Sequence, residues 1–198
     1  MSNKTPVVNP HGFWEGDGGH IFDERLAEAL AGFFKRNAAS SIVDLGCGEG
    51  KYVKHLRECG LNVDGFDGNP NCPFVTNGMC KVLDLAVPSV LEKSYDWVLS
   101  LEVAEHLPSQ YERIFCKNLH NNNASGIVMS WAVEGQGGHG HFNERNNDYV
   151  KEIFEDLGYE NDTESEIVLR NASTLWWFKK TIMVFRKKKT NQGKQKEM

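Results

Sequence analysis

The sequence lacks a long apolar run, and no stretch of it approaches the roughly 20 residues that a helix needs to cross a bilayer. This absence excludes a transmembrane helix. The first segment, Met1–Pro10, contains neither a basic cluster nor an apolar stretch, so we expect no signal peptide. With 198 residues, of which 40% are hydrophobic, the chain fits one compact soluble domain.

Cysteine pairs with the spacing of a metal site or a redox site are also missing. The chain has five cysteines, an odd number, and none of them forms a C-x-x-C pair or shows the spacing of zinc ligands. Free thiols in a reducing compartment are the simplest interpretation. We therefore expect a cytoplasmic protein without a metal site.

Positive charge is concentrated at the C-terminus. The net charge is −5, yet residues 186–198 contain six basic residues and one acidic residue, so the rest of the chain is strongly acidic. An acidic body argues against a broad nucleic-acid-binding surface. We interpret residues 187–198 as a basic, disordered tail, and contact of this tail with RNA or an anionic lipid stays open.

Short apolar segments alternate with amphipathic segments along most of the chain. Strands are predicted at 40–45, 61–66, 81–85, 95–101, 125–133, 167–169 and 181–186, and helices at 21–36, 51–59, just after Pro88, 108–120 and 147–157. The alternation predicts an α/β fold with right-handed βαβ units, in which a doubly wound, mainly parallel seven-stranded sheet has helices on both faces. No helix is predicted between the last two strands, so they should pair with each other and leave the final strand antiparallel.

These elements predict a single domain over residues 1–186. Residues 1–38 would form an N-terminal lid and helix region, and residues 39–186 would form the core. In an open parallel sheet, ligands bind beyond the C-terminal ends of the strands. The residues that follow the strands are therefore the candidates for a functional site.

The first predicted strand ends in the glycine-rich segment 44–50, Asp-Leu-Gly-Cys-Gly-Glu-Gly. Its glycines let the backbone turn tightly and approach a ligand closely, and the helix that follows offers free N–H groups. The phosphate-binding pattern G-x-G-x-x-G requires a glycine at position 51, which is Lys51. Asp67, at the end of the second strand, stands where a carboxylate accepts the hydroxyl groups of a ribose. Together these residues predict a site for a nucleoside without phosphates.

Four segments in register resemble the motifs of class I (Rossmann-like) S-adenosylmethionine-dependent methyltransferases. They are Asp44-x-Gly46-x-Gly48-x-Gly50 and residues 65–70, 82–85 and 95–107. The resemblance implies the Rossmann-like methyltransferase fold. It also implies S-adenosylmethionine as the cofactor and S-adenosylhomocysteine as the product.

The resemblance further implies which residues contact each part of the cofactor. The methionine part would meet Asp44, Gly46, Cys47 and Gly48; the ribose Asp67 and Gly68; the adenine Asp84 and Leu85; and the methyl group Leu101 and Glu102. Trp14, in the N-terminal lid, would cover the bound cofactor, although simple packing of this residue on the sheet stays open. For Asp84 a helix-capping role before Pro88 stays open.

Histidines follow the fourth and fifth strands, where a methyl acceptor would lie. His106 follows the fourth strand, and His141 belongs to a glycine-rich loop that is typical of mobile functional loops. We treat His141, His106 and Glu102 as candidate catalytic residues, with a histidine as general base if the acceptor is a hydroxyl or a protonated amine. Simple packing of the histidines stays open. A metal pair of His139 and His141 is disfavoured, because only glutamates at 134 and 144 lie nearby in the sequence.

The sequence therefore predicts a methyltransferase that acts on a small-molecule acceptor, because the body is acidic and no recognition domain is appended. RNA or protein methylation guided by the basic tail is an alternative, although the fourth strand lacks the N/D-P-P-Y/F pattern of amino methylation on nucleic-acid bases. A catalytically inactive partner that binds the cofactor is a further alternative. An NAD-dependent dehydrogenase is disfavoured by Lys51.

Overall fold

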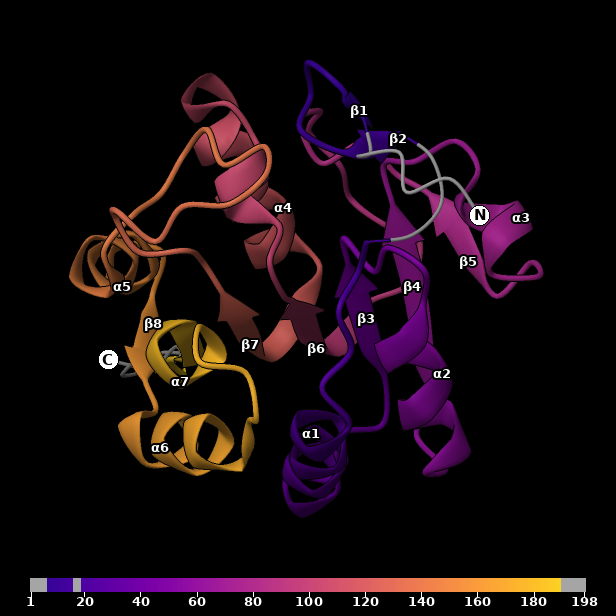
Figure 1. Cartoon of the computed structure of the whole chain (residues 1–198). Coiled ribbons are helices and arrows are strands. Elements are labelled where there is room, and N and C mark those ends of the chain that lie inside the picture. The colour runs from indigo at the N-terminus through magenta and orange to yellow at the C-terminus, as the bar shows by residue number, and fades with distance from the viewer. Residues whose placement is uncertain (1–6, 16–18, 190–198) are drawn as a thin grey trace, which may run out of the picture.

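One central sheet organises the molecule, and its strand order is β5-β4-β3-β6-β7-β9-β8 (Figure 1). The structure is a computed structural model that describes residues 7–15 and 19–189. The strands of this sheet are β3 (Ile42–Leu45), β4 (Val63–Asp67), β5 (Cys80–Val82), β6 (Tyr95–Ser100), β7 (Asn123–Ser130), β8 (Tyr159–Asn161) and β9 (Ile182–Lys187). The neighbours from β5 to β7 pair in parallel, whereas β9 pairs antiparallel with both β7 and β8. The doubly wound, mainly parallel seven-stranded sheet with an antiparallel final strand is thereby confirmed.

Helices cover both faces of the sheet, as Figure 1 shows. They are α1 (Glu24–Arg36), α2 (Lys51–Glu58), α3 (Cys72–Val75), α4 (Glu112–Asn121), α5 (Asn147–Asp156), α6 (Thr163–Ala172) and α7 (Phe178–Thr181). Buried strand residues alternate between two cores: Ile42 and Trp97 pack with α1, α2 and α6, whereas Val43 and Val98 pack with α4 and α5. Strands buried on both faces explain the nearly continuous apolar segments in the sequence. Within the described ranges, each helix is too short or too polar to cross a membrane.

The C-terminal elements differ from the prediction. Residues 167–169 belong to helix α6, and the edge strand that pairs with β9 on the side away from β7 is β8, which the sequence pattern does not predict. The β-branched residues Ile167 and Val168 suggest a strand, but their side chains are 53% and 52% exposed on the helix surface. Asp162 caps this helix by accepting a hydrogen bond from the Ser165 N–H at 3.0 Å. Two helices, α6 and α7, therefore separate the last two strands.

The segment after Pro88 is irregular, so the predicted helical stretch is wrong. The backbone N–H groups of Ser89 and Leu91 donate to the side-chain oxygens of Asn118 on α4 and of Asn122, the C-cap of α4, each at 2.8 Å. These side chains satisfy the polar groups that a helix would otherwise bond internally. The tertiary contact with α4 thus decides the conformation of this segment.

Two contacts hold the N-terminal region against the rest of the domain. Asp23, the N-cap of α1, accepts hydrogen bonds from Ser173 Oγ at 2.6 Å and from the Thr174 N–H at 2.7 Å. The hairpin of β1 (Val7–Val8) and β2 (Trp14–Glu15) packs on the segment after β6. At Gly12 a Cβ atom would lie only 2.5 Å from the backbone oxygen of His106, so the two backbones are in close contact.

The predicted basic tail begins inside the folded part of the chain. Lys187 is the last residue of β9, and its Nζ donates to the backbone oxygens of His120 and Asn123 at 3.2 and 2.9 Å. Residues 190–198 of the predicted tail lie outside the described residues. The division into a lid and helix region at 1–38 and a core at 39–186 stays a prediction.

Candidate active site

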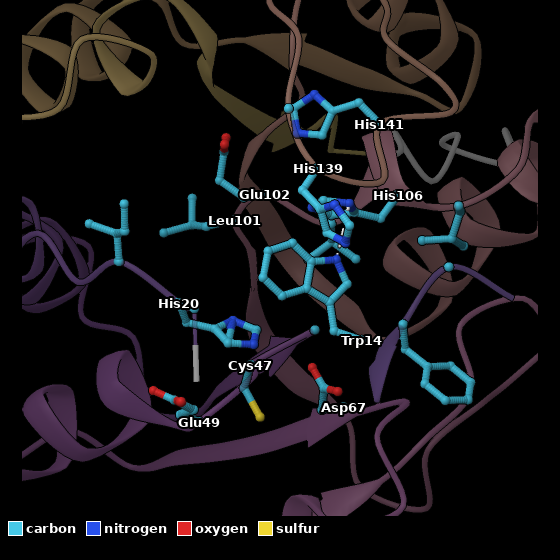
Figure 2. A pocket seen from close by; sticks show the side chains of 18 of the residues that line it. Trp14, His20, Cys47, Glu49, Asp67, Leu101, Glu102, His106, His139 and His141 are labelled. Carbon is cyan, nitrogen blue, oxygen red and sulfur yellow. Dashed lines mark hydrogen bonds between the residues drawn. The ribbon is translucent and has the colours of Figure 1, made fainter. Parts of the chain in front are cut away.

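A cavity of about 380 Å³ lies at the C-terminal ends of β3, β4 and β6. Its walls come from residues 11–14, 19–22, the glycine loop after β3, the ends of β4 and β6, residues 136–139, His141 and residues 176–178. Figure 2 shows Asp67 and Cys47 on one side of this space and His141 on the opposite side, with Trp14 between them. The position matches the ligand crevice of open α/β sheets.

The glycine loop between β3 and α2 requires glycine for both conformation and space. Gly46, Gly48 and Gly50 have φ angles of 89°, 54° and 70°, in the left-handed region. At Gly46 a Cβ atom would lie 2.3 Å from a methyl carbon of Val103. The bare backbone of Gly46 therefore forms part of the cavity wall.

Asp67 connects the end of β4 to this loop. One of its carboxylate oxygens accepts a hydrogen bond from the Gly48 N–H, and the other accepts one from the Asn69 N–H, both at 2.8 Å. Burial raises the pKa of Asp67 above its ordinary value. Each carboxylate oxygen can accept a further hydrogen bond, so the side chain can bind two neighbouring hydroxyl groups in the cavity.

Two further carboxyl groups make this cavity acidic. Asp44 is 3% exposed, and burial raises its pKa well above the ordinary range. Glu102 follows β6 with a φ of 55°, and its Oε1 accepts a hydrogen bond from Ser130 Oγ at 2.8 Å. Burial raises the pKa of Glu102 to about 7. A fixed positive charge nearby would favour the ionised form of both groups, so the cavity suits a cationic ligand.

Histidines and Trp14 form the opposite end of the cavity. The His106 ring contacts the Trp14 ring with centroids 5.2 Å apart, and His106 Nδ1 lies 3.0 Å from the Gly140 oxygen. His141 Nδ1 lies 3.0 Å from a carboxylate oxygen of Glu144. Burial lowers the pKa of His106 to about 4, so its imidazole is neutral at pH 7. A neutral imidazole can accept a proton or bind a metal ion.

The same fold occurs in solved methyltransferase structures of low sequence identity. Magnesium protoporphyrin IX methyltransferase from Synechocystis PCC 6803, with bound S-adenosylhomocysteine, is 17% identical, with a TM-score of 0.62 and coverage of 87% of this chain and 90% of that chain. A TehB-like methyltransferase from Corynebacterium glutamicum is 20% identical, with a TM-score of 0.60 and coverage of 87% and 90%. The methyltransferase domain of a bacterial Hen1 is 17% identical, with a TM-score of 0.60 and coverage of 83% and 98%. No curated protein sequence matches the chain.

A family profile decides the assignment. The profile of a methyltransferase domain family matches residues 19–121, just over half of the 198 residues. The chain belongs to this methyltransferase family. The match and the fold confirm a class I methyltransferase whose cofactor is S-adenosylmethionine.

Most of the predicted cofactor residues of this methyltransferase line one cavity: Trp14, Asp44, Gly46, Cys47, Asp67, Gly68, Leu85 and Leu101. Gly48 and Asp84 do not line it. Gly48 instead directs its N–H to Asp67. The Asp84 carboxylate lies 2.5 Å from His11 Nδ1 and accepts a hydrogen bond from the Ala86 N–H at 2.9 Å. A contact between Asp84 and the adenine stays a prediction.

The candidate catalytic residues Glu102, His106 and His141 all line this cavity as well. Beside them lies Glu105, a site residue that the sequence analysis misses. Glu105 is 0% exposed, and its carboxylate lies close to a nitrogen of each of these two histidines. The signal for it is the spacing Glu102-x-x-Glu105-His106, which places three ionisable residues beside a buried strand.

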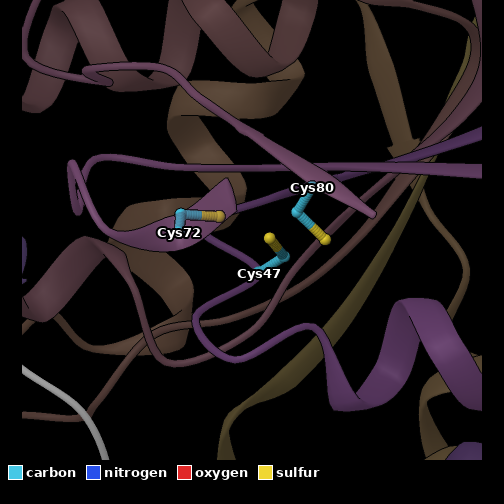
Figure 3. A group of neighbouring side chains, drawn as sticks. All are labelled: Cys47, Cys72 and Cys80. Carbon is cyan, nitrogen blue, oxygen red and sulfur yellow. The ribbon is translucent and has the colours of Figure 1, made fainter. Parts of the chain in front are cut away.

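Three cysteines meet beneath the glycine loop of the methyltransferase, as Figure 3 shows. The sulfur atoms of Cys47, Cys72 and Cys80 all lie within 4.8 Å of one another, and all three thiols are free. Hydrogen bonds from Cys47 and Cys72 lower the pKa of Cys80 to about 4. The sequence gives no sign of this cluster, because the glycine loop, α3 and β5 each supply one of its cysteines.

Proposed function

We propose that this methyltransferase transfers its methyl group to a small-molecule acceptor. The observation that carries the proposal is the charge of the cavity wall. Asp44, Glu49, Asp67 and Glu102 line the cavity, whereas Lys51, its one lysine among the described residues, forms an ion pair with Glu49 at 2.6 Å. An acidic wall repels the phosphates of a nucleic acid.

The aromatic cover over the end of the cavity that His106, His141 and Trp14 form, here called the acceptor end, also supports a small-molecule acceptor. The Trp14 ring contacts the rings of His20, His106 and His139, with centroids 5.3, 5.2 and 5.8 Å apart. These contacts join the N-terminal segment to the loop after β7 across the cavity. Such a cover suits an acceptor that enters the cavity whole, and it excludes water from the reacting atoms.

The chemistry requires little beyond alignment by the protein. S-adenosylmethionine supplies a methyl group that its sulfonium already activates. We assign the ribose hydroxyls to Asp67, and the buried carboxyl groups of Asp44 and Glu102 favour a positive charge beside them. Leu101 and Trp177 add apolar wall, so acceptor and methyl group are held together in a dry site.

We assign the positioning of the acceptor to Glu102, His106 and His141. His106→Ala and His141→Ala should each lower kcat about 100-fold or more while the affinity for S-adenosylmethionine stays within about threefold. Methyl transfer to the acceptor fraction of a cell extract measures kcat, and calorimetry measures the affinity for S-adenosylmethionine. His120→Ala, on α4 and outside the cavity, is the matched control and should keep wild-type turnover. Unchanged turnover in both test variants would contradict the assignment.

A labelling experiment tests the acceptor class. The protein is incubated with S-adenosylmethionine labelled in the methyl group and a cell extract separated into small molecules, RNA and protein. We expect the label in the small-molecule fraction, and we expect a chain ending at Lys189 to transfer it equally well. The cut at this point keeps Lys187 and its hydrogen bonds to α4 and β7.

RNA methylation is the second candidate function. The small RNA methyltransferase HEN1 shares the fold with a TM-score of 0.63 at 15% identity, and residues 186–189 of this chain are basic. In the same experiment, label in RNA would favour this function over the small-molecule acceptor, also in the chain that ends at Lys189, because the basic residues 186–189 are kept there. Cofactor binding without label in any fraction would instead favour an inactive protein.

A further inference from the structure

Glu105, His106 and His141 form a cluster that alignment of a methyl acceptor alone does not explain. One ligand atom from each of the three side chains lies within 4.8 Å of the other two. Glu105 and His106 come from the 3₁₀ turn Ala104–His106, and His141 comes from the loop after β7. The cluster thus joins two segments that both line the acceptor end of the cavity.

The Glu105 carboxyl group has fewer hydrogen-bond partners than a buried acid normally has. It is 0% exposed, and neither of its oxygens has a hydrogen-bond partner of good geometry among the described residues. Burying a carboxylate without a partner is costly, so buried acids are normally paired or bound to a metal ion. The Glu102 carboxyl group lies beside Glu105, and two negative charges at this distance oppose each other, so a cation nearby would stabilise the ionised form of both groups.

Backbone hydrogen bonds hold the third residue in place. The N–H groups of Phe142 and Asn143 both donate to the backbone oxygen of Glu105, at 2.8 and 3.0 Å. These bonds fasten the chain immediately after His141 to the 3₁₀ turn. The approach of His141 to Glu105 is therefore built into the fold.

Both imidazoles are oriented as metal ligands are. His106 Nδ1 lies 3.0 Å from the Gly140 oxygen, closer than the 3.4 Å to Trp14 Nε1, so this nitrogen carries the proton. His141 Nδ1 faces the Glu144 carboxylate, which also accepts two backbone hydrogen bonds from the same loop. An Nδ1–H held by an oxygen leaves a lone pair on Nε2, and this arrangement is usual for histidines that bind metals.

We propose that Glu105, His106 and His141 bind a divalent first-row transition-metal ion at the acceptor end of the cavity. Two imidazoles with one carboxylate favour such an ion over magnesium or calcium, which prefer oxygen ligands throughout. Three protein ligands leave coordination positions open towards the cavity. Resting on the proposed function, we infer that an oxygen atom of the acceptor occupies one of them.

Manganese(II) binding to the untagged full chain tests the site without measuring turnover. Electron paramagnetic resonance counts free Mn(II), and we expect one bound ion per chain. Glu105→Gln and His141→Ala should each weaken binding at least about 30-fold, and Glu144→Gln should weaken it about 10-fold through the orientation of His141. His139→Ala, two residues along the same loop, is the matched control and should bind Mn(II) like the wild type.

The thiol cluster and the fold need separate controls. Cys72→Ser should leave Mn(II) affinity unchanged, because Mn(II) prefers oxygen and nitrogen ligands to thiolates. Glu105→Gln replaces a buried ionisable group with a neutral one of the same shape, so its Tm in EDTA should equal or exceed that of the wild type, and saturating Mn(II) should raise the Tm of the wild type alone.

Two outcomes overturn the inference. One is the absence of bound Mn(II) in the folded wild type, and the other is wild-type Mn(II) affinity in both Glu105→Gln and His141→Ala. Calorimetry with S-adenosylmethionine in EDTA keeps the proposed function separate. Retained cofactor binding with absent metal binding removes only the metal site. Absent cofactor binding contradicts the methyltransferase activity, whatever the result with Mn(II).

Discussion

Replacing Asp67 with asparagine should weaken the binding of S-adenosylmethionine about 100-fold or more. Asp67 holds the Gly48 and Asn69 N–H groups through two different carboxylate oxygens. Asparagine offers one acceptor oxygen, and its NH₂ group would face either a backbone N–H or a ribose hydroxyl. Hydrogen bonds to a charged group contribute about 1.5–3 kcal/mol each, so the loss of two ribose contacts corresponds to at least a 100-fold change in Kd.

Asp64→Asn is the matched control for this experiment. Asp64 belongs to the same strand, β4, but it forms ion pairs with Lys93 at 2.9 Å and Arg57 at 3.4 Å outside the cavity. Titration calorimetry should show wild-type cofactor affinity for this control. Wild-type affinity in Asp67→Asn itself, with the fold verified by circular dichroism, would remove Asp67 from the cofactor site.

Gly46→Ala should both destabilise the protein and abolish measurable cofactor binding. A Cβ atom at this position would lie 2.3 Å from Val103 Cγ2 and 2.9 Å from Val103 Cγ1, and the φ of 89° is unfavourable for alanine. Strain of the backbone and crowding of a packed side chain together should cost about 2–4 kcal/mol of unfolding free energy. Relief of the crowding would shift the loop into the space that the methionine part of the cofactor requires.

Two variants separate the crowding from the strain. Gly60 has a similar φ of 84°, but no atom lies within 4 Å of a Cβ placed there, so Gly60→Ala should cost only about 1 kcal/mol and keep full cofactor affinity. Val103→Ala, added to Gly46→Ala, removes the obstructing methyl carbons and should restore part of the stability. Urea denaturation measures both effects. If Gly46→Ala is no less stable than Gly60→Ala, the close contact with Val103 has no energetic consequence.

Local sequence patterns are sufficient where one segment makes the whole feature. The glycine loop is an example, because its turn, its spacing and the following helix all lie within residues 44–58. The alternation of apolar strands and amphipathic helices predicts the parallel sheet for the same reason. Asp67 is predictable from its position at the end of the next strand, since β3 and β4 pair directly.

Patterns fail where a distant contact decides the structure. The segment after Pro88 has the composition of a short helix, but the side chains of Asn118 and Asn122 bind its backbone instead. Asp84, the predicted adenine ligand, contacts His11, which lies 73 residues earlier in the chain. Neither partner is recognisable without the fold.

The sequence by itself determines the class of this protein: a parallel α/β sheet with a methyltransferase glycine loop and Asp67 beyond it. Each of these features depends on residues that are close in the chain or on adjacent strands. Only the tertiary structure brings Glu105 and His106 to His141, and Cys47 to Cys72 and Cys80. The physical reason is that these groups meet through strand order and loop anchoring, and no periodicity or spacing along the chain encodes such contacts.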